Sequence, residues 1–224
     1  MIYSSKHGIF TMVLLLLASN YIKMGISVHP EAKGLIFDLD GTLSDSLPVH
    51  VATWNKVGDK YGFVFDTQII YELTGRPTIE FAERIIDQYN ISEEPKVLVQ
   101  LKQKAFWELA HLLKPIDEVV SIVKTFYEKM PMAVGTGASR KSAEIQLEAL
   151  NLTKYFDNIV SANDVSKHKP DPDTFLECAR LIGVEPRYCQ VFEDGDLGIA
   201  AAKKANMFVT DIREHINYGE WKLS

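Results

Sequence analysis

Cysteine is scarce in this chain, since its 224 residues contain only Cys178 and Cys189. Two cysteines cannot build the disulfide framework of a small secreted domain. No CxxC motif or Cys/His cluster indicates a zinc site. This composition fits a reducing compartment, so we expect a cytoplasmic protein.

Positive charge is also in short supply. The chain has 24 Lys and Arg residues against 30 Asp and Glu residues, a formal net charge of −6. A broad nucleic-acid-binding surface needs an excess of basic side chains over one face, so we expect no nucleic-acid partner. A small anionic substrate is still compatible with this balance, because a local positive site can lie inside an acidic protein.

Long hydrophobic runs are missing as well. The apolar stretch at 9–18 has ten residues, and about 20 are needed to span a bilayer. Three explanations are open for residues 1–30: an over-long gene model whose true start is Met24, a signal peptide or membrane tether, and an ordered helix. We favour the first, because no small-residue cleavage site follows the run, and we expect no membrane partner.

What the chain does contain is a regular alternation of short apolar runs and helical patterns. The apolar runs, which predict buried strands, lie at 34–37, 132–134, 158–160, 189–192 and 207–210. Helical patterns fill the intervals at 117–128, 142–150, 173–181 and 197–205. This alternation predicts an α/β fold with a Rossmann-like parallel sheet and helices on both faces.

One interval is much longer than the others. Residues 48–114 carry helical patterns, for example at 49–62, 78–89 and 97–113, and no strand-like run of any length. The block is too long for a single crossover between strands. We therefore expect an α/β core in residues 31–47 and 115–224, with a small helical cap domain inserted at 48–114.

Acidic residues follow the first and fourth predicted strands. Asp38 and Asp40 are two residues apart on an extended chain, so their side chains point the same way. Two close carboxylates repel unless a cation or a proton lies between them. Glu193 and Asp194 offer hard oxygen ligands of the kind that Mg²⁺ prefers. The alternatives are an Asp-Gly turn with capping acids and a solvated acidic loop.

Two further segments could bind an anion. Thr136 and Gly137 follow the second strand and precede a helix, where a hydroxyl and free N–H groups can bind phosphate. The alternative is a glycine turn with a Thr or Ser helix cap. Lys169 lies on a Pro-flanked loop and could supply a point charge, whereas we expect Lys167 to be a surface lysine.

Together, the segments FDLDGT, VGTG, KHKPDPDTF and VFEDGDLG resemble the four signatures of the haloacid dehalogenase (HAD) superfamily, in its Mg²⁺-dependent phosphatase and phosphomutase branch. The resemblance covers about residues 33–213. The β-phosphoglucomutase-like enzymes are the most similar, and among them the fructose-1-phosphate and 6-phosphogluconate phosphatases.

The resemblance implies a Mg²⁺-dependent phosphatase that acts on a small phosphorylated sugar through an aspartyl-phosphate. We expect it to be a monomer. Asp38 would be the nucleophile and Asp40 the general acid and base. The implied Mg²⁺ ligands are Asp38, the backbone carbonyl of Asp40, Asp194 and Glu193, the last through a water or by orienting the site. The implied phosphate-binding residues are Thr136, Gly137 and Lys169.

The resemblance is weaker in the cap, where substrate contacts are expected from His50, Arg76, Thr78 and Lys104. Helix packing is an equal alternative for His50. The main functional alternative is a phosphomutase, which would share every core residue. The mutases carry an arginine in the cap loop for a second phosphate. This chain has Thr78 at that position with Arg76 close by, which favours hydrolysis.

Overall fold

The computed structural model describes residues 25–73, 76–216 and 218. The apolar stretch at 9–18 and the first two residues of the predicted cap loop, Thr74 and Gly75, lie outside the described residues. None of the helices in the described ranges is long and apolar enough to cross a membrane.

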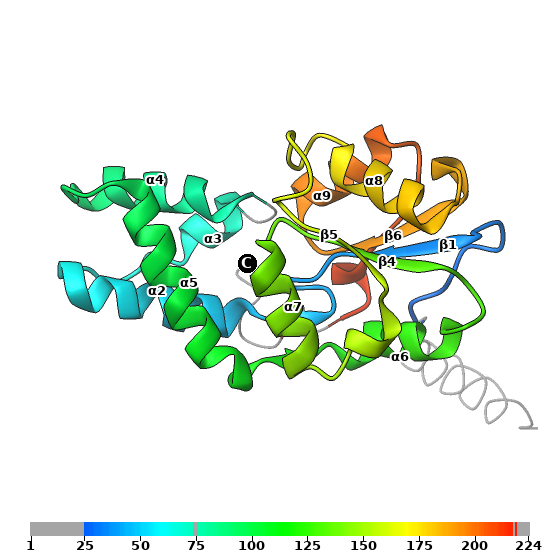
Figure 1. The fold of residues 1–224 in the computed structure, drawn as a ribbon, viewed down its shortest axis with the longest axis horizontal. Coiled ribbons are helices and arrows are strands. Elements are labelled where there is room, and N and C mark those ends of the chain that lie inside the picture. Colours follow the sequence, from blue (N-terminus) through cyan, green and yellow to red (C-terminus); the bar gives the residue numbers. More distant parts are fainter. Residues whose placement is uncertain (1–24, 74–75, 217, 219–224) are drawn as a thin grey trace, which may run out of the picture.

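Within these ranges, one five-stranded parallel sheet forms the centre of the molecule (Figure 1). Its strands, in spatial order, are β5 (Asn158–Val160), β4 (Met132–Gly135), β1 (Gly34–Phe37), β6 (Cys189–Glu193) and β7 (Phe208–Asp211). The predicted α/β fold with a parallel sheet is thereby confirmed. Because the strands are parallel, the segments that follow β1, β4 and β6 meet at the same edge.

Helices cover both faces of the sheet, as predicted. One face packs on α6 (Asp117–Phe126) and α7 (Arg140–Ala149), and the other on α8 (Asp173–Ile182) and α9 (Asp196–Lys204). Side chains of β1 alternate between the faces, as strand geometry requires. Leu35 and Phe37 join the core under α6 and α7, and Ile36 joins the core under α8 and α9.

The long interval after β1 is a helical insertion. It contains α2 (Leu47–Tyr61), α3 (Gln68–Leu73), α4 (Thr78–Tyr89) and α5 (Pro95–Leu109). These helices have their own apolar core, built around Trp54, Ile69, Ile85 and Leu98. In Figure 1 they lie to the left of the sheet. The insertion therefore has a hydrophobic core that is separate from the two cores on the faces of the sheet.

Short elements connect these parts. The two strands β2 (Ser44–Asp45) and β3 (Lys114–Pro115) pair antiparallel where the chain enters and leaves the insertion. Single 3₁₀ turns η1 to η4 lie at Ala110–Leu112, Thr153–Tyr155, Pro186–Tyr188 and Ile212–Glu214. The β2–β3 pair ties the two connections together, so the insertion is held over the carboxyl edge of the sheet.

Candidate active site

A cavity of about 540 Å³ lies between the carboxyl edge of the sheet and the helical insertion. From the sheet side its walls include Asp38, Asp40, Thr136, Gly137 and Asp194, and from the insertion they include His50, Arg76, Thr78, Lys102 and Phe106. The structure thus brings together residues from the loops after β1, β4 and β6 that lie more than 150 positions apart in the chain (Thr42 and Asp194 are 152 apart).

The most buried part of the site is an ion cluster around Lys169. Its Nζ donates to Asp38 Oδ1 at 2.6 Å and to Glu193 Oε2 at 2.7 Å, and the lysine is only 1% exposed. Burial lowers the pKa of Lys169, but Asp38 and Glu193 outweigh it and the net pKa is raised. The lysine is therefore a permanent cation beneath the cavity floor.

Glu193 uses both carboxylate oxygens inside the protein. Oε2 accepts from Lys169, and Oε1 accepts from the backbone N–H groups of Asp194 and Gly195, at 3.1 and 2.9 Å. The carboxylate packs against α9 at Gly198, where a Cβ atom would collide with it. This arrangement suits a residue that orients its neighbours more than one that binds substrate directly.

Asp194 lies closer to the cavity. Its Oδ1 accepts from the Thr42 hydroxyl at 2.9 Å, and its carboxylate lies against Gly41, which has φ of 82° and no room for a Cβ. Burial, and then the charge of Glu193, raise the pKa of Asp194 to about 8. Burial and Glu193 also raise the pKa of Asp38, although Lys169 opposes the shift.

These carboxylates have the chemistry of a cation site. Asp38, Glu193 and Asp194 can each present an oxygen such that all three oxygens lie within 4.8 Å of one another. Three carboxylates face one ammonium, and this uncompensated negative charge adds to burial in raising the pKa values of Asp38 and Asp194. A divalent cation would balance it. Because both oxygens of Glu193 are already hydrogen-bonded, Asp38 and Asp194 are the better direct ligands.

The segment after β4 forms the opposite wall. Thr136 is 1% exposed, and its Oγ1 accepts from the Ala138 N–H at 3.0 Å. Ser139 caps α7 by accepting from the N–H of Ser142. Thr136, Gly137 and Ser139 all line the cavity beside this helix start, where N–H groups and the helix dipole favour an anion.

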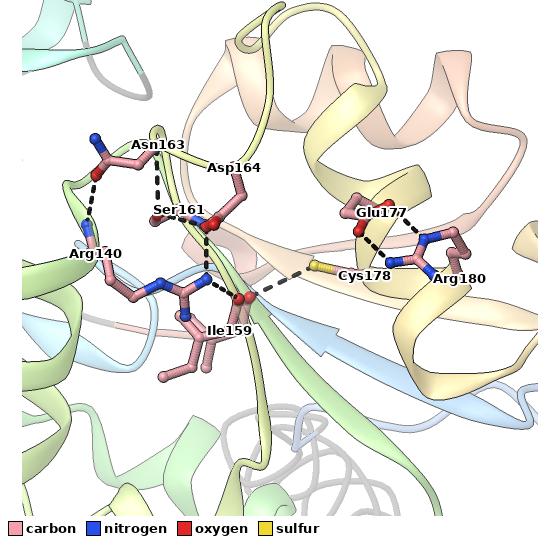
Figure 2. A network of polar contacts seen from close by, with 9 residues as sticks. Arg140, Ile159, Ser161, Asn163, Asp164, Glu177, Cys178 and Arg180 are labelled. Carbon is pink, nitrogen blue, oxygen red and sulfur yellow. Dashed lines mark hydrogen bonds and ion pairs between the residues drawn. The ribbon is translucent and has the colours of Figure 1, made fainter.

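A polar network holds this helix start against the neighbouring strand (Figure 2). Arg140 Nη2 donates to the Ile159 carbonyl and to Asp164, each at 2.7 Å, and the Arg140 N–H donates to Asn163. Asp164 also accepts from the N–H and hydroxyl of Ser161. The loop after β5, which leads on to Lys169, is thereby joined to the N-terminal end of α7.

Asp40 lies at the boundary between sheet and insertion. Its Oδ1 is 2.9 Å from His50 Nε2 and accepts from Gln146 Nε2 at 3.0 Å. On the far side of the imidazole, Lys102 Nζ is 3.0 Å from His50 Nδ1. A neutral imidazole with its proton on Nε2 satisfies both contacts. Burial, then Lys102, lowers the pKa of His50, which agrees with this neutral form.

The insertion presents some of the expected residues to the cavity and not others. His50, Arg76 and Thr78 line it, and Arg76 Nη1 lies 3.4 Å from Glu80 on α4. Lys104 is exposed and is not among the lining residues. The reason is helical periodicity, because the buried face of α5 carries Lys102, four residues after Leu98, and Lys104 lies off that face.

Four residues of the site have no place among the sequence predictions. Thr42 holds Asp194, Gln146 contacts Asp40, Lys102 contacts His50, and the Tyr218 hydroxyl donates to the Gly41 carbonyl at 2.7 Å. The i, i+4 spacing of the polar residues Ser142 and Gln146 on one helix is a signal that could have indicated Gln146. Nothing in the local sequence around Tyr218 indicates its contact.

Comparison with known proteins agrees with this geometry. A family model described as haloacid dehalogenase-like hydrolase matches residues 35–212. The chain is 43% identical over 188 residues to fructose-1-phosphate phosphatase YqaB of Escherichia coli, covering 83% of this chain and 99% of the relative. It is 29% identical over 187 residues to β-phosphoglucomutase of Bacillus subtilis, covering 80% and 83%. The crystal structure of β-phosphoglucomutase from Clostridium difficile matches with a TM-score of 0.68 at 27% identity, covering 80% of this chain and 83% of that one.

Proposed function

The chain belongs to the haloacid dehalogenase-like hydrolase family, as its four motifs predict, and from that premise we propose a Mg²⁺-dependent phosphatase that hydrolyses a small phosphorylated sugar. The observation that carries the proposal is the cluster of Asp38, Asp194 and Glu193 around Lys169, which opens on a cavity beneath the helical insertion. A relative named as a fructose-1-phosphate phosphatase supports the substrate class.

In the first step, Asp38 attacks phosphorus in line, and the bond between phosphorus and the sugar oxygen breaks. Bound Mg²⁺ would supply positive charge to the phosphate and to the ionised carboxylates. Asp38 and Asp194 would hold it. Lys169 adds a fixed cation, and Thr136 with the N–H groups before α7 would bind the non-bridging oxygens.

Asp40 would supply the proton that the leaving sugar oxygen requires. Burial raises the pKa of Asp40, but its contacts with His50 and Ser46 outweigh burial, so the net pKa is lowered. A phosphate dianion bound beside this carboxyl group would raise that pKa again, because like charges disfavour ionisation. In the second step, Asp40 takes a proton from the water that attacks the aspartyl-phosphate, and Asp38 is regenerated.

The charges around the cavity favour a sugar that carries one phosphate and no other anionic group. The arginines and the lysine among the described lining residues are already engaged: Arg76 with Glu80, Arg213 with Asp196 and Asp211, and Lys102 with His50. Further acids, Asp45 and Glu72, also line the walls. Of the two expected substrates, fructose 1-phosphate therefore fits better than 6-phosphogluconate, whose carboxylate would have to compete for one of these engaged cations.

A screen of phosphorylated metabolites for phosphate release in Mg²⁺ tests this proposal. We expect fructose 1-phosphate to exceed 6-phosphogluconate and fructose 1,6-bisphosphate in kcat/KM by about tenfold or more, the equivalent of about 1.4 kcal/mol. A preference for the bisphosphate or the sugar acid would contradict the charge argument. Absence of phosphate release from every sugar phosphate would contradict the phosphatase itself.

The second candidate function is that of a phosphomutase, because the chain is also similar to β-phosphoglucomutases. A mutase must hold a bisphosphate while the sugar turns, so its insertion needs a cation for the distal phosphate. Arg76 could take this role only by leaving Glu80. The test is incubation with β-glucose 1-phosphate and a trace of glucose 1,6-bisphosphate. Formation of glucose 6-phosphate with little free phosphate would establish the mutase.

A further inference from the structure

The amide of Gln146 makes a contact that the four family motifs do not account for. Gln146 lies on α7, is 0% exposed and lines the cavity. Its Nε2 donates to Asp40 Oδ1, whereas its buried Oε1 has no hydrogen-bond partner among the described residues. A buried acceptor without a partner costs stability. An apolar side chain would fit a purely structural position better, which points to a role in the reaction.

The geometry at Asp40 indicates what that role is. His50 on α2 and Gln146 on α7 both reach the same carboxylate oxygen, Oδ1, at 2.9 and 3.0 Å. Two donors from different helices restrict rotation of the carboxyl group. The Ser46 side chain also favours the ionised form of this carboxyl group and so lowers its pKa. With Oδ1 already accepting two hydrogen bonds, a proton on Asp40 belongs on Oδ2.

We propose that Gln146 is a positioning residue, which holds Asp40 so that the proton on Oδ2 faces the departing sugar oxygen. In this step the bond from phosphorus to the sugar oxygen breaks, and a new bond forms from phosphorus to Asp38. The sugar oxygen keeps the electron pair and receives the proton from Oδ2, which leaves Asp40 ionised. This inference rests on the proposed phosphatase function and assigns a residue outside the motifs that define the family.

Leaving-group chemistry separates positioning from a structural role. The alkoxide of a sugar is a poor leaving group and needs the proton from Asp40, whereas 4-nitrophenolate leaves well without it. The parameter kcat/KM covers steps up to the first phosphoryl transfer and not the later attack of water on the intermediate. The ratio of kcat/KM between fructose 1-phosphate and 4-nitrophenyl phosphate therefore reports how well the proton is delivered.

The variants are Gln146→Met and Gln146→Leu, which keep the bulk of the side chain and remove both polar atoms. We expect kcat/KM for fructose 1-phosphate to fall by about 10- to 100-fold, as for loss of a hydrogen bond to a charged group. The value for 4-nitrophenyl phosphate should change by less than about threefold on the same reasoning. The melting temperature should equal or exceed that of the parent, because the unpartnered Oε1 is gone.

Gln190→Met is the matched control. Gln190 is also buried, at 3% exposure, but it lies on β6 away from the cavity lining. Its amide is fully engaged, accepting from the His29 N–H and donating to Thr210 and to the Ser27 carbonyl. This variant should have a lower melting temperature and an unchanged ratio of kcat/KM between the two substrates. That is the opposite of the pattern expected for the Gln146 variants.

Each result bears on the inference. An equal fall for both substrates together with a lower melting temperature would show that Gln146 is structural. An unchanged ratio in both Gln146 variants would also overturn positioning. If the parent protein releases no phosphate from any sugar phosphate, the proposed function itself fails. If the parent is active but the Gln146 variants have the same ratio of kcat/KM for the two substrates as the parent, the proposed phosphatase function is supported and the positioning role of Gln146 is wrong.

Discussion

The two walls of the cavity differ in how their charged residues are held. On the sheet side, Asp38, Lys169 and Glu193 are 5%, 1% and 1% exposed and contact one another directly. On the insertion side, the side chains of Arg76 and Glu80 are 36% and 33% exposed and 3.4 Å apart. Breaking a buried pair leaves an uncompensated charge, whereas an exposed pair contributes little. We therefore expect the sheet side to carry the chemistry and the insertion to set which sugar is bound.

The largest effect is expected from Asp38→Asn. The amide is nearly isosteric but is a poor nucleophile and a poor cation ligand, so turnover should fall to background. The fold should survive, because Lys169 keeps its ion pair with Glu193. The neutral amide also relieves the burial of a charge and the repulsion by Glu193, which together raise the pKa of Asp38. Phosphate release and thermal melting measure the two effects. Turnover within tenfold of the parent would remove Asp38 as the nucleophile.

Metal removal should also abolish turnover. Activity should vanish in EDTA and return with Mg²⁺. Mg²⁺ at about 100 times its Kd should stabilise the parent by about 2.7 kcal/mol relative to EDTA, since it binds only the folded state. In Asp194→Asn this stabilisation should be much smaller, which gives a readout that does not depend on activity. Full activity in EDTA would show that the acidic cluster works without a metal.

An intermediate effect is expected where the two walls meet. Lys102→Met removes the donor to His50, and His50 contacts Asp40. Loss of one hydrogen bond to a charged group costs about 1.5–3 kcal/mol, so kcat/KM should fall by about 10- to 150-fold. Lys102→Arg is the matched control for charge. A change below threefold in Lys102→Met would place Lys102 with the variable part of the insertion.

Lys102 also makes stability depend on pH. Burial lowers its pKa in the folded protein from 10.5 to about 8, although Asp40 opposes the shift. Between those pH values the unfolded chain binds one more proton, so folding stability rises as pH increases. Between pH 7 and pH 11, the free energy of unfolding of the parent should therefore rise by about 3 kcal/mol more than that of the Lys102→Met variant. Denaturant titrations of both proteins measure the gap, and a constant gap would contradict the burial of a charged lysine.

The smallest effect is expected from Arg76→Ala on the insertion. The Arg76–Glu80 pair is partly exposed, so the free energy of unfolding should change by no more than about 1 kcal/mol. We expect KM for the sugar phosphate to change by a few-fold and kcat to stay near the parent value, because Arg76 lines the cavity from the insertion and Asp38 lines it from the sheet side. A large fall in kcat would mean that this exposed part of the insertion takes part in the chemistry, and the contrast between the walls would fail.

The fold was predictable because its signals are local. Each predicted strand is a short apolar run, and each strand observed in the sheet begins and ends within one or two residues of its predicted bounds. Helix α3 and the strands β2 and β3 were not predicted individually. The reason is length, since six- and two-residue elements carry too few periodic positions to be distinguished.

The core motifs could be placed together from the order of the strands, because parallel strands bring the segments after β1, β4 and β6 to one edge. The amino-acid sequence by itself therefore determined the α/β fold and the family. It also determined which residues match the family motifs, namely Asp38, Asp40, Thr136, Lys169 and Asp194. These follow from residue type and from order along the chain, which folding does not alter.

Only the tertiary structure decided which other side chains reach those residues. Gln146 meets Asp40 across 106 positions, Tyr218 meets Gly41 across 177, and Lys102, not Lys104, reaches His50. The physical reason is that such contacts depend on how helices rotate and pack against the sheet. A rotation of one helical residue, about 100°, turns a cavity-facing side chain toward solvent, and no local pattern in the chain specifies that angle.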